Sequence, residues 1–349
     1  MFFASDNWAG VHPAIARRLS EESSGFSAAY GASELDKRVE QRFNALFERE
    51  VAIFFVGTGT AANALALAAV NRPGGVSFCH REAHMIEDEC GAPEFFTHGA
   101  RLAPVDGENG KIDPGNLKAE IARFPPNFIH AGQPMAVSIT QATEIGTLYK
   151  PDEIKAIAAI AKAKQLPLHM DGARFANALT ALNLTPAEMT WQCGVDIVSF
   201  GATKNGCWCA EALVFMEPGM AKDLPFIRKR AAQLFSKTRF IAGQFDAYLD
   251  DDLWLNSARH ANEMADYLQK GIEQGQNARL GWHTQTNEVF CIMSKDFAAY
   301  LKQQGALFHE WNPPRAKAGL LAENEVLTRL VTSFATEKAH VDRFIELLG

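Results

Sequence analysis

The chain has 349 residues, with 34 lysines and arginines against 41 aspartates and glutamates, so its formal net charge is −7. This acidic balance disfavours nucleic acid as the main partner, because proteins that bind phosphate backbones carry a basic excess or stripe. A hydrophobic content of 47% is ordinary for a folded protein and excludes a disordered or fibrous chain. At about 150 residues per domain, the length predicts about two domains.

No apolar run approaches the roughly 18 residues that a membrane span needs, and the opening MFFASDNWAG lacks the basic start of a secretory signal. We therefore expect no membrane partner. The six cysteines are scattered, which is typical of reduced thiols in a cytoplasmic protein. Cys207 and Cys209 have no second pair, so we expect no metal site.

Short apolar runs alternate with helical patterns over the first two thirds of the chain, which favours an α/β fold with a mostly parallel sheet. The run VAIFFV predicts a strand over 51–56, and the next segment predicts a helix over 60–70. The later segments predict helices over 114–123 and 152–164 and strands over 166–170, 195–200 and 212–216.

The pattern changes near residue 245, where shorter strands and interspersed helices predict a smaller α+β domain. Its expected elements are helix 256–272, strand 289–293, helix 295–304, strands 306–310 and 326–334, and a final helix after Thr336-Glu337. We predict an N-terminal arm over 1–24, a large domain over 25–245 and a small domain over 246–349.

Gly57-Thr58-Gly59-Thr60 follows the first predicted strand and opens the next helix. The free N–H groups at a helix N-terminus suit a phosphate, and small residues let a ligand approach the backbone. An ordinary strand–helix turn would also use glycine, and the segment matches neither the GxGxxG nor the Walker pattern. Both interpretations stay open for this segment alone.

The strand 166–170 runs into Asp171-Gly172-Ala173-Arg174. Ligands of open α/β sheets gather at the C-terminal ends of strands, where Asp171 can pair with a ligand cation and Arg174 with a carboxylate. The alternative is that Asp171 caps the following helix and Arg174 pairs locally. His169 faces the same side of the strand as Asp171 and is expected to be a core or supporting residue.

A lysine follows the strand 195–200, in Gly201-Ala202-Thr203-Lys204-Asn205-Gly206. A desolvated lysine can form a Schiff base, although a surface loop would also use lysine. A pyridoxal 5'-phosphate enzyme needs a phosphate cradle, a carboxylate on the pyridinium nitrogen and a Schiff-base lysine. Together the three segments predict a site for this cofactor.

Seven segments, in order, resemble the low-specificity L-threonine aldolases: SDN (5–7), AYG (29–31), GTGTAAN (57–63), EAHMIEDECGA (82–92), HMDGARFANA (169–178), FGATKNG (200–206) and RLVTSF (329–334). That family belongs to the β-eliminating lyase/threonine aldolase group of fold-type I pyridoxal phosphate enzymes. The resemblance implies a large domain with a seven-stranded, mostly parallel sheet and a smaller C-terminal domain. It also implies a homodimer or homotetramer with active sites at subunit interfaces.

The resemblance implies a role for each matching residue. Lys204 would hold the cofactor, Asp171 would contact its pyridinium nitrogen, and His84 would stack on its ring. The other implied cofactor contacts are Gly59, Thr60, Gln141 and Arg174, and the implied contacts of the substrate carboxylate are Ser5, Arg174 and Arg329.

This sequence departs from many family members at Thr140-Gln141-Ala142-Thr143-Glu144, where they have a histidine that touches the substrate hydroxyl. With Thr143 at that position, we predict weak discrimination between L-threonine and L-allo-threonine.

The expected reaction is retro-aldol cleavage of L-threonine, L-allo-threonine or a related β-hydroxy-α-amino acid to glycine and an aldehyde. His84, directly or through water, is the candidate acceptor of the hydroxyl proton. Another pyridoxal phosphate reaction on the same scaffold, by a β-eliminating lyase or an aminotransferase, is the alternative, because a fold does not decide the outcome. A binding protein without catalysis is disfavoured by the intact Lys204 and Asp171.

Overall fold

The apolar runs of the first two thirds of the chain form one seven-stranded sheet in a computed structural model that describes all 349 residues. Its order is β1-β7-β6-β5-β4-β2-β3, and β7 alone runs against its neighbours. The strands are β1 (Ala52–Val56), β2 (Gly75–His80), β3 (Arg101–Val105), β4 (Gln133–Thr140), β5 (Leu168–Gly172), β6 (Ile197–Gly201) and β7 (Glu211–Phe215).

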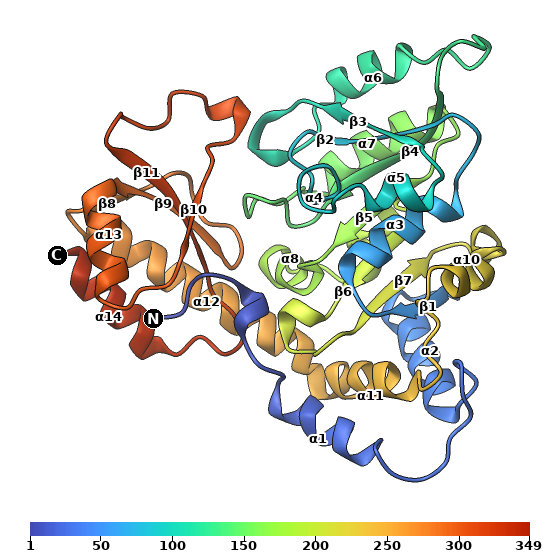
Figure 1. The fold of residues 1–349 in the computed structure, drawn as a ribbon, viewed down its shortest axis with the longest axis horizontal. Coiled ribbons are helices and arrows are strands. Elements are labelled where there is room, and N and C mark those ends of the chain that lie inside the picture. Colours follow the sequence, from blue (N-terminus) through green and yellow to red (C-terminus); the bar gives the residue numbers. More distant parts are fainter.

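Helices cover both faces of this sheet (Figure 1). The largest core lies under α2 (Glu34–Leu46), α6 (Pro114–Ala122), α7 (Pro151–Ala163), α8 (Phe175–Leu182) and α11 (Arg239–Tyr248). The opposite face is covered by α3 (Gly59–Ala69) and α10 (Leu224–Arg230). The short helices are α4 (His84–Glu87), α5 (Ala92–Phe96) and α9 (Pro186–Met189).

A second, antiparallel sheet forms the smaller part of the molecule, in the order β10-β11-β9-β8 (Figure 1). Its strands are β8 (Ala278–Leu280), β9 (Glu288–Ser294), β10 (His309–Trp311) and β11 (Glu325–Val331), and α13 (Lys295–Gln303) and α14 (Lys338–Leu348) accompany them. The long helix α12 (Leu253–Gln274) joins the two parts, because Trp254 packs in the large core and Leu268 in the small one.

The first residues of the chain contact both parts of the molecule. Phe3 lies in the small core, where its N–H donates to the Leu307 carbonyl (2.8 Å) and its carbonyl accepts from the Val331 N–H (2.8 Å). Helix α1 (Pro13–Glu21) then places Ile15 in the large core.

A buried carboxylate fastens α1 and α2 to α11. Asp246 of α11 accepts hydrogen bonds from Arg18 of α1 (2.7 Å) and from Arg38 (2.8 Å) and Arg42 (3.1 Å) of α2. Its side chain is only 5% exposed, so these charge-assisted bonds replace most of its hydration. Phe43 of α2 and Phe245 of α11 in turn pack on Phe55 of β1 and Phe200 of β6.

The predicted α/β fold with a smaller α+β part is confirmed. Most predicted elements agree with the structure to within a few residues, as α3 and α7 show. The strand expected over 306–310 is shorter and begins at His309, because Leu307 instead pairs with Phe2 at the start of the chain. None of the helices combines the length and the apolar character needed to cross a bilayer. The boundary at 245 falls inside α11 and stays a prediction.

Candidate active site

A cavity of about 400 Å³ lies where the parallel strands of the large sheet end, and it collects the three predicted segments. Its wall includes Gly59 and Thr60 at the start of α3, Asp171 at the end of β5, and Lys204 after β6. His84 of α4 also lines it. Strand ends of an open α/β sheet are the general position of ligand sites.

The start of α3 presents free backbone donors to this cavity. Thr58 caps the helix, because its hydroxyl accepts from the Ala61 N–H at 3.1 Å and its carbonyl accepts from the Ala62 N–H. The N–H groups of Gly59 and Thr60 have no acceptor in the protein. Unpaired donors at the N-terminus of an 11-residue helix suit a phosphate, so the structure favours the phosphate interpretation of this segment.

Lys204 enters the cavity from a short 3₁₀ turn, Thr203–Asn205, after β6. The turn is fixed by Asn205, whose amide donates to the Tyr248 hydroxyl (2.7 Å) and to the Trp254 carbonyl (2.8 Å). The ε-amine of Lys204 has no hydrogen bond and no ion pair, although the side chain is half-buried. It is therefore a free amine held on a rigid turn.

Asp171 belongs to a chain of buried polar groups. Its carboxylate accepts from the Ala173 N–H (3.1 Å) and from the Asn63 amide (2.8 Å), and the same amide donates to Glu89 (2.8 Å). Nδ1 of His84 donates to Glu89 at 2.9 Å. Asp171 does not cap α8, because Arg174 occupies the N-cap position. Sequence reasoning named neither Asn63 nor Glu89, and only their place inside two matching segments distinguished them.

The hydrogen bond to Glu89 favours the protonated form of His84. It raises the pKa of His84 above its ordinary value, even though burial acts in the opposite direction. Burial raises the pKa of Glu89 as well, and the nearby Asp171 adds to this shift. When His84 carries its second proton, its other ring nitrogen can donate a hydrogen bond, and the side chain lines the cavity.

The two predicted carboxylate-binding arginines meet at Glu288, behind the cavity wall. Buried Arg174 binds Asp6 through two hydrogen bonds (2.8 and 3.1 Å) and lies 3.3 Å from Glu288. Nη1 of Arg329 lies 3.6 Å from the same Glu288 oxygen, and its guanidinium stacks on Trp311 at 4.1 Å. Neither arginine is among the residues that line the cavity.

Glu288 is a buried carboxyl between these two arginines, and its protonation state sets the net charge of the group. Both of its oxygens are buried without a hydrogen-bond partner, and burial raises its pKa despite Arg174 and Arg329 beside it. Burial also acts to raise the pKa of Asp6, but Arg174 and Lys204 hold it below its ordinary value. Asp6 is therefore the ionised partner of Arg174, and it is a site residue that the sequence analysis did not single out.

Two further residues, predicted to contact the cofactor or the substrate, make their hydrogen bonds outside the cavity. The side-chain amide of Gln141 donates to the Tyr149 carbonyl (2.9 Å) and accepts from the Tyr149 N–H (2.9 Å), so it closes a loop and does not line the cavity. Ser5 caps a 3₁₀ turn, Asp6–Trp8, by accepting from the Asn7 N–H (3.1 Å), and it is Asn7 that reaches the cavity wall.

His169 behaves as the core residue that its position predicted. Its ring is hydrogen-bonded to Ser138 of β4 (2.8 Å) and to Ser199 of β6 (2.9 Å), on the two strands beside its own. Burial lowers its pKa to about 4, so it stays neutral at physiological pH. It supports Ser199, which lines the cavity floor.

The donor set fits pyridoxal 5'-phosphate: unpaired N–H groups for its phosphate, a carboxylate for its ring nitrogen and a free lysine amine for its aldehyde. Fold and cavity together define a pyridoxal phosphate-dependent enzyme of fold type I. The beta-eliminating lyase family profile matches residues 3–296. The chain belongs to the beta-eliminating lyase family and, within it, is grouped with the low-specificity L-threonine aldolases.

The individual relatives agree with this assignment. Low specificity L-threonine aldolases of a Pseudomonas species and of Pseudomonas aeruginosa are 40% and 41% identical over 307 residues, which is 88% of this chain and 88% of each relative. The structure of a Leishmania major threonine aldolase is 28% identical and superposes with a TM-score of 0.91 over 99% of this chain and 98% of that one.

Proposed function

We propose that this protein cleaves L-threonine, L-allo-threonine and related β-hydroxy-α-amino acids to glycine and an aldehyde. The observation that carries the proposal is 40% identity to a low specificity L-threonine aldolase over 88% of both chains. The cavity supports it, because Lys204, Asp171 and the start of α3 line the same cavity at the end of the sheet.

The residues that would hold the cofactor follow from their contacts. The N–H groups of Gly59 and Thr60 would bind the phosphate, Asp171 would contact the ring nitrogen, and Lys204 would hold the aldehyde carbon. His84 lines the same cavity and would stack on the ring. When bound, pyridoxal phosphate supplies an electron sink for the bond that breaks at Cα.

The two arginines would hold the substrate carboxylate, with Ser5 nearby. Arg174 is neutralised by Asp6, whereas Arg329 shares only Glu288 at 3.6 Å. When Glu288 carries a proton, which its raised pKa favours, the cluster of Asp6, Arg174, Glu288 and Arg329 has one net positive charge. That charge complements an incoming carboxylate.

Assembly with a second copy of the chain is also proposed. Trp208 lines the cavity mouth with 62% of its surface exposed, and Phe26 is fully exposed on the segment after α1. An exposed aromatic side chain that lines a site, as Trp208 does, supports a surface that a partner covers. We further propose a cytoplasmic location, which six free cysteines support.

The test is product analysis of the purified holoenzyme with L-threonine. Glycine and acetaldehyde are expected in equal amounts, whereas pyruvate and ammonia would show a β-eliminating reaction instead. Lys204→Ala is expected to lose the visible absorption of the bound cofactor and to slow cleavage by several orders of magnitude, because the covalent attachment is lost. The exposed Lys222→Ala serves as the control. Near-normal turnover in Lys204→Ala would overturn the assignment.

A further inference from the structure

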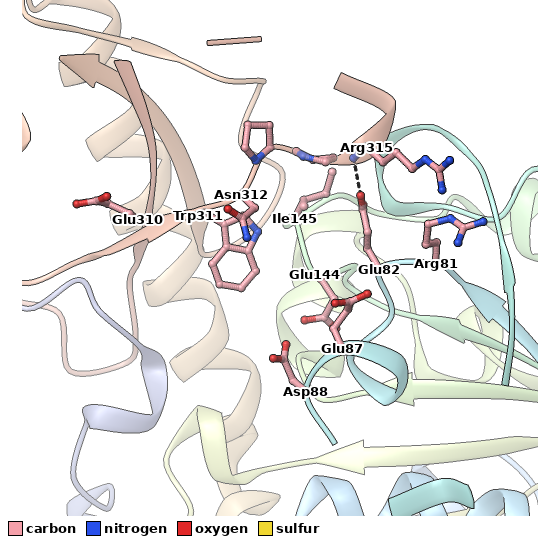
Figure 2. A pocket seen from close by; sticks show the side chains of 12 residues that line it. Arg81, Glu82, Glu87, Asp88, Glu144, Ile145, Glu310, Trp311, Asn312 and Arg315 are labelled. Atoms are coloured by element: carbon pink, nitrogen blue, oxygen red, sulfur yellow. Dashed lines mark hydrogen bonds between the residues drawn. The ribbon is translucent and has the colours of Figure 1, made fainter. Parts of the chain in front are cut away.

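A cleft of about 530 Å³ opens beside the cavity, between the loops of the large sheet and the small domain. Figure 2 shows Trp311 and Asn312 on the small-domain side and Glu82 on the opposite side, where it accepts from the Arg315 N–H at 2.6 Å. Glu144 lines both the cleft and the cavity. It therefore lies at the junction of the two.

The turn that carries Glu144 is fixed on both sides of the residue. The Thr143 N–H donates to the Thr147 carbonyl (2.9 Å), and the hydroxyls of the two threonines lie 2.6 Å apart. Gly146 takes a left-handed conformation (φ +71°), and its carbonyl accepts from Thr286. The indole of Trp282 donates to the Ile145 carbonyl (3.0 Å). Such a turn holds the carboxyl in one place before substrate arrives, as catalytic groups require.

The carboxyl of Glu144 has no hydrogen-bond partner within the protein, in contrast to Asp171 and Glu89. Lys204, His84, Asp171 and Arg174 act on its pKa by their charges, and the carboxyls of Glu87 and Asp88 line the same cleft (Figure 2). Burial and the charge of Asp171 raise the pKa of Glu144, while Lys204, His84 and Arg174 act to lower it. It is a partly buried acceptor without a hydrogen-bond partner, and it lines the same cavity as Lys204.

We propose that Glu144 is a catalytic residue that accepts the proton of the substrate β-hydroxyl while the Cα–Cβ bond breaks. The O–H bond pair becomes the second C–O bond of the aldehyde, and the Cα–Cβ pair stays with the glycine fragment. One proton then returns to Cα, so the substrate divides into glycine and aldehyde without an added reactant.

The contacts favour Glu144 over His84 for this task. His84 is bound to Glu89, which stabilises its protonated form, so it is better suited to donate to the hydroxyl or aldehyde oxygen. Burial raises the pKa of Glu144 above its ordinary value, and a base is most effective when its pKa approaches the working pH.

The test compares Glu144→Gln with the control Glu108→Gln, an exposed carboxyl on a neighbouring loop. Two kinds of measurement are made on the holoenzyme. The first is kcat/KM for L-threonine and for L-allo-threonine. The second is the dissociation constant of glycine, obtained from the change in cofactor absorption. Since glycine has no hydroxyl, Glu144→Gln is expected to leave its binding within about twofold while cleavage of both epimers falls about 10²-fold or more. The acid limb of the wild-type pH profile should disappear with the carboxyl.

The inference rests on the proposed aldolase function, and the two can fail separately. If wild type releases no aldehyde, the function fails; if wild type does and Glu144→Gln keeps more than about a third of the activity, the inference alone fails. A parallel loss of glycine binding would show a structural role and would also overturn it. Glu144→Asp keeps an acid at this position, so it must retain the acid limb and exceed Glu144→Gln in kcat; equal rates would refute the assignment.

Discussion

Asn63 provides the sharpest test of how the site is held together. Its amide nitrogen donates to both Asp171 and Glu89 at 2.8 Å, and all three side chains are buried. Asn63→Leu keeps the volume of the side chain but removes both donors. The two carboxylates then face each other without a shared partner.

The expected loss follows from the two bonds. A hydrogen bond to a charged group contributes about 1.5–3 kcal/mol, so the variant should lose about 3–6 kcal/mol of unfolding free energy. Glu89 has a pKa already raised by burial and by Asp171, and the substitution raises it further. The variant can take up a proton in acid and relieve the repulsion, so its deficit relative to wild type should be smaller at pH 6 than at pH 8.

Urea unfolding followed by tryptophan fluorescence, on protein without cofactor at both pH values, measures this difference. Asn177→Leu is the matched control, because Asn177 is also buried but donates to the neutral Asn262 (3.0 Å). Its loss should be about 1 kcal/mol and should not depend on pH. A deficit for Asn63→Leu below about 1 kcal/mol, or one that is the same at both pH values, would refute the reasoning.

Two further predictions concern buried acids. Burial raises the pKa of Glu211 from 4.5 to about 7. The contribution of Glu211 to the wild-type unfolding free energy should therefore fall by about 3 kcal/mol as the pH rises from 4.5 to about 7. Glu211→Gln removes that fall; urea unfolding of both proteins at pH 5 and pH 8 checks it, and parallel curves would contradict it. Asp246→Asn leaves three arginines of α1 and α2 without their carboxylate, and because those arginines are partly exposed we expect a loss of about 2–3 kcal/mol in thermal unfolding. A change under 0.5 kcal/mol, roughly that of an ordinary surface substitution, would argue against the network.

Sequence patterns predicted the parts of the site that depend on local structure. Gly59, Asp171 and Lys204 each follow a strand whose apolar run is visible, and parallel strands bring their ends together. Contacts between distant segments left no such local signal. The pairing of Asp6 with Arg174 spans 168 positions, and the bond of Asn63 to Asp171 spans 108.

Gln141 and Glu144 show the same limit over a shorter distance. A sequence of small polar residues does not say which side chains turn inward. The register of the loop is decided when Gln141 pairs with Tyr149 and Thr143 with Thr147, and these bonds leave Glu144 facing the cavity. Only the three-dimensional arrangement distinguishes the loop-closing residues from the one beside the reacting groups.

The contact of the first residues with the last strands has a consequence for how the protein acquires its site. Phe3 pairs with Leu307 and Val331, and Asp6 holds Arg174 together with Asn287. A growing chain makes residues 1–6 before their partners near 287–331, with more than 270 residues between them. Closing so long a loop is slow and entropically costly, so the large sheet can form well before the arginines are in place. Ordering of the substrate end of the site is thereby coupled to synthesis of residues 287–331.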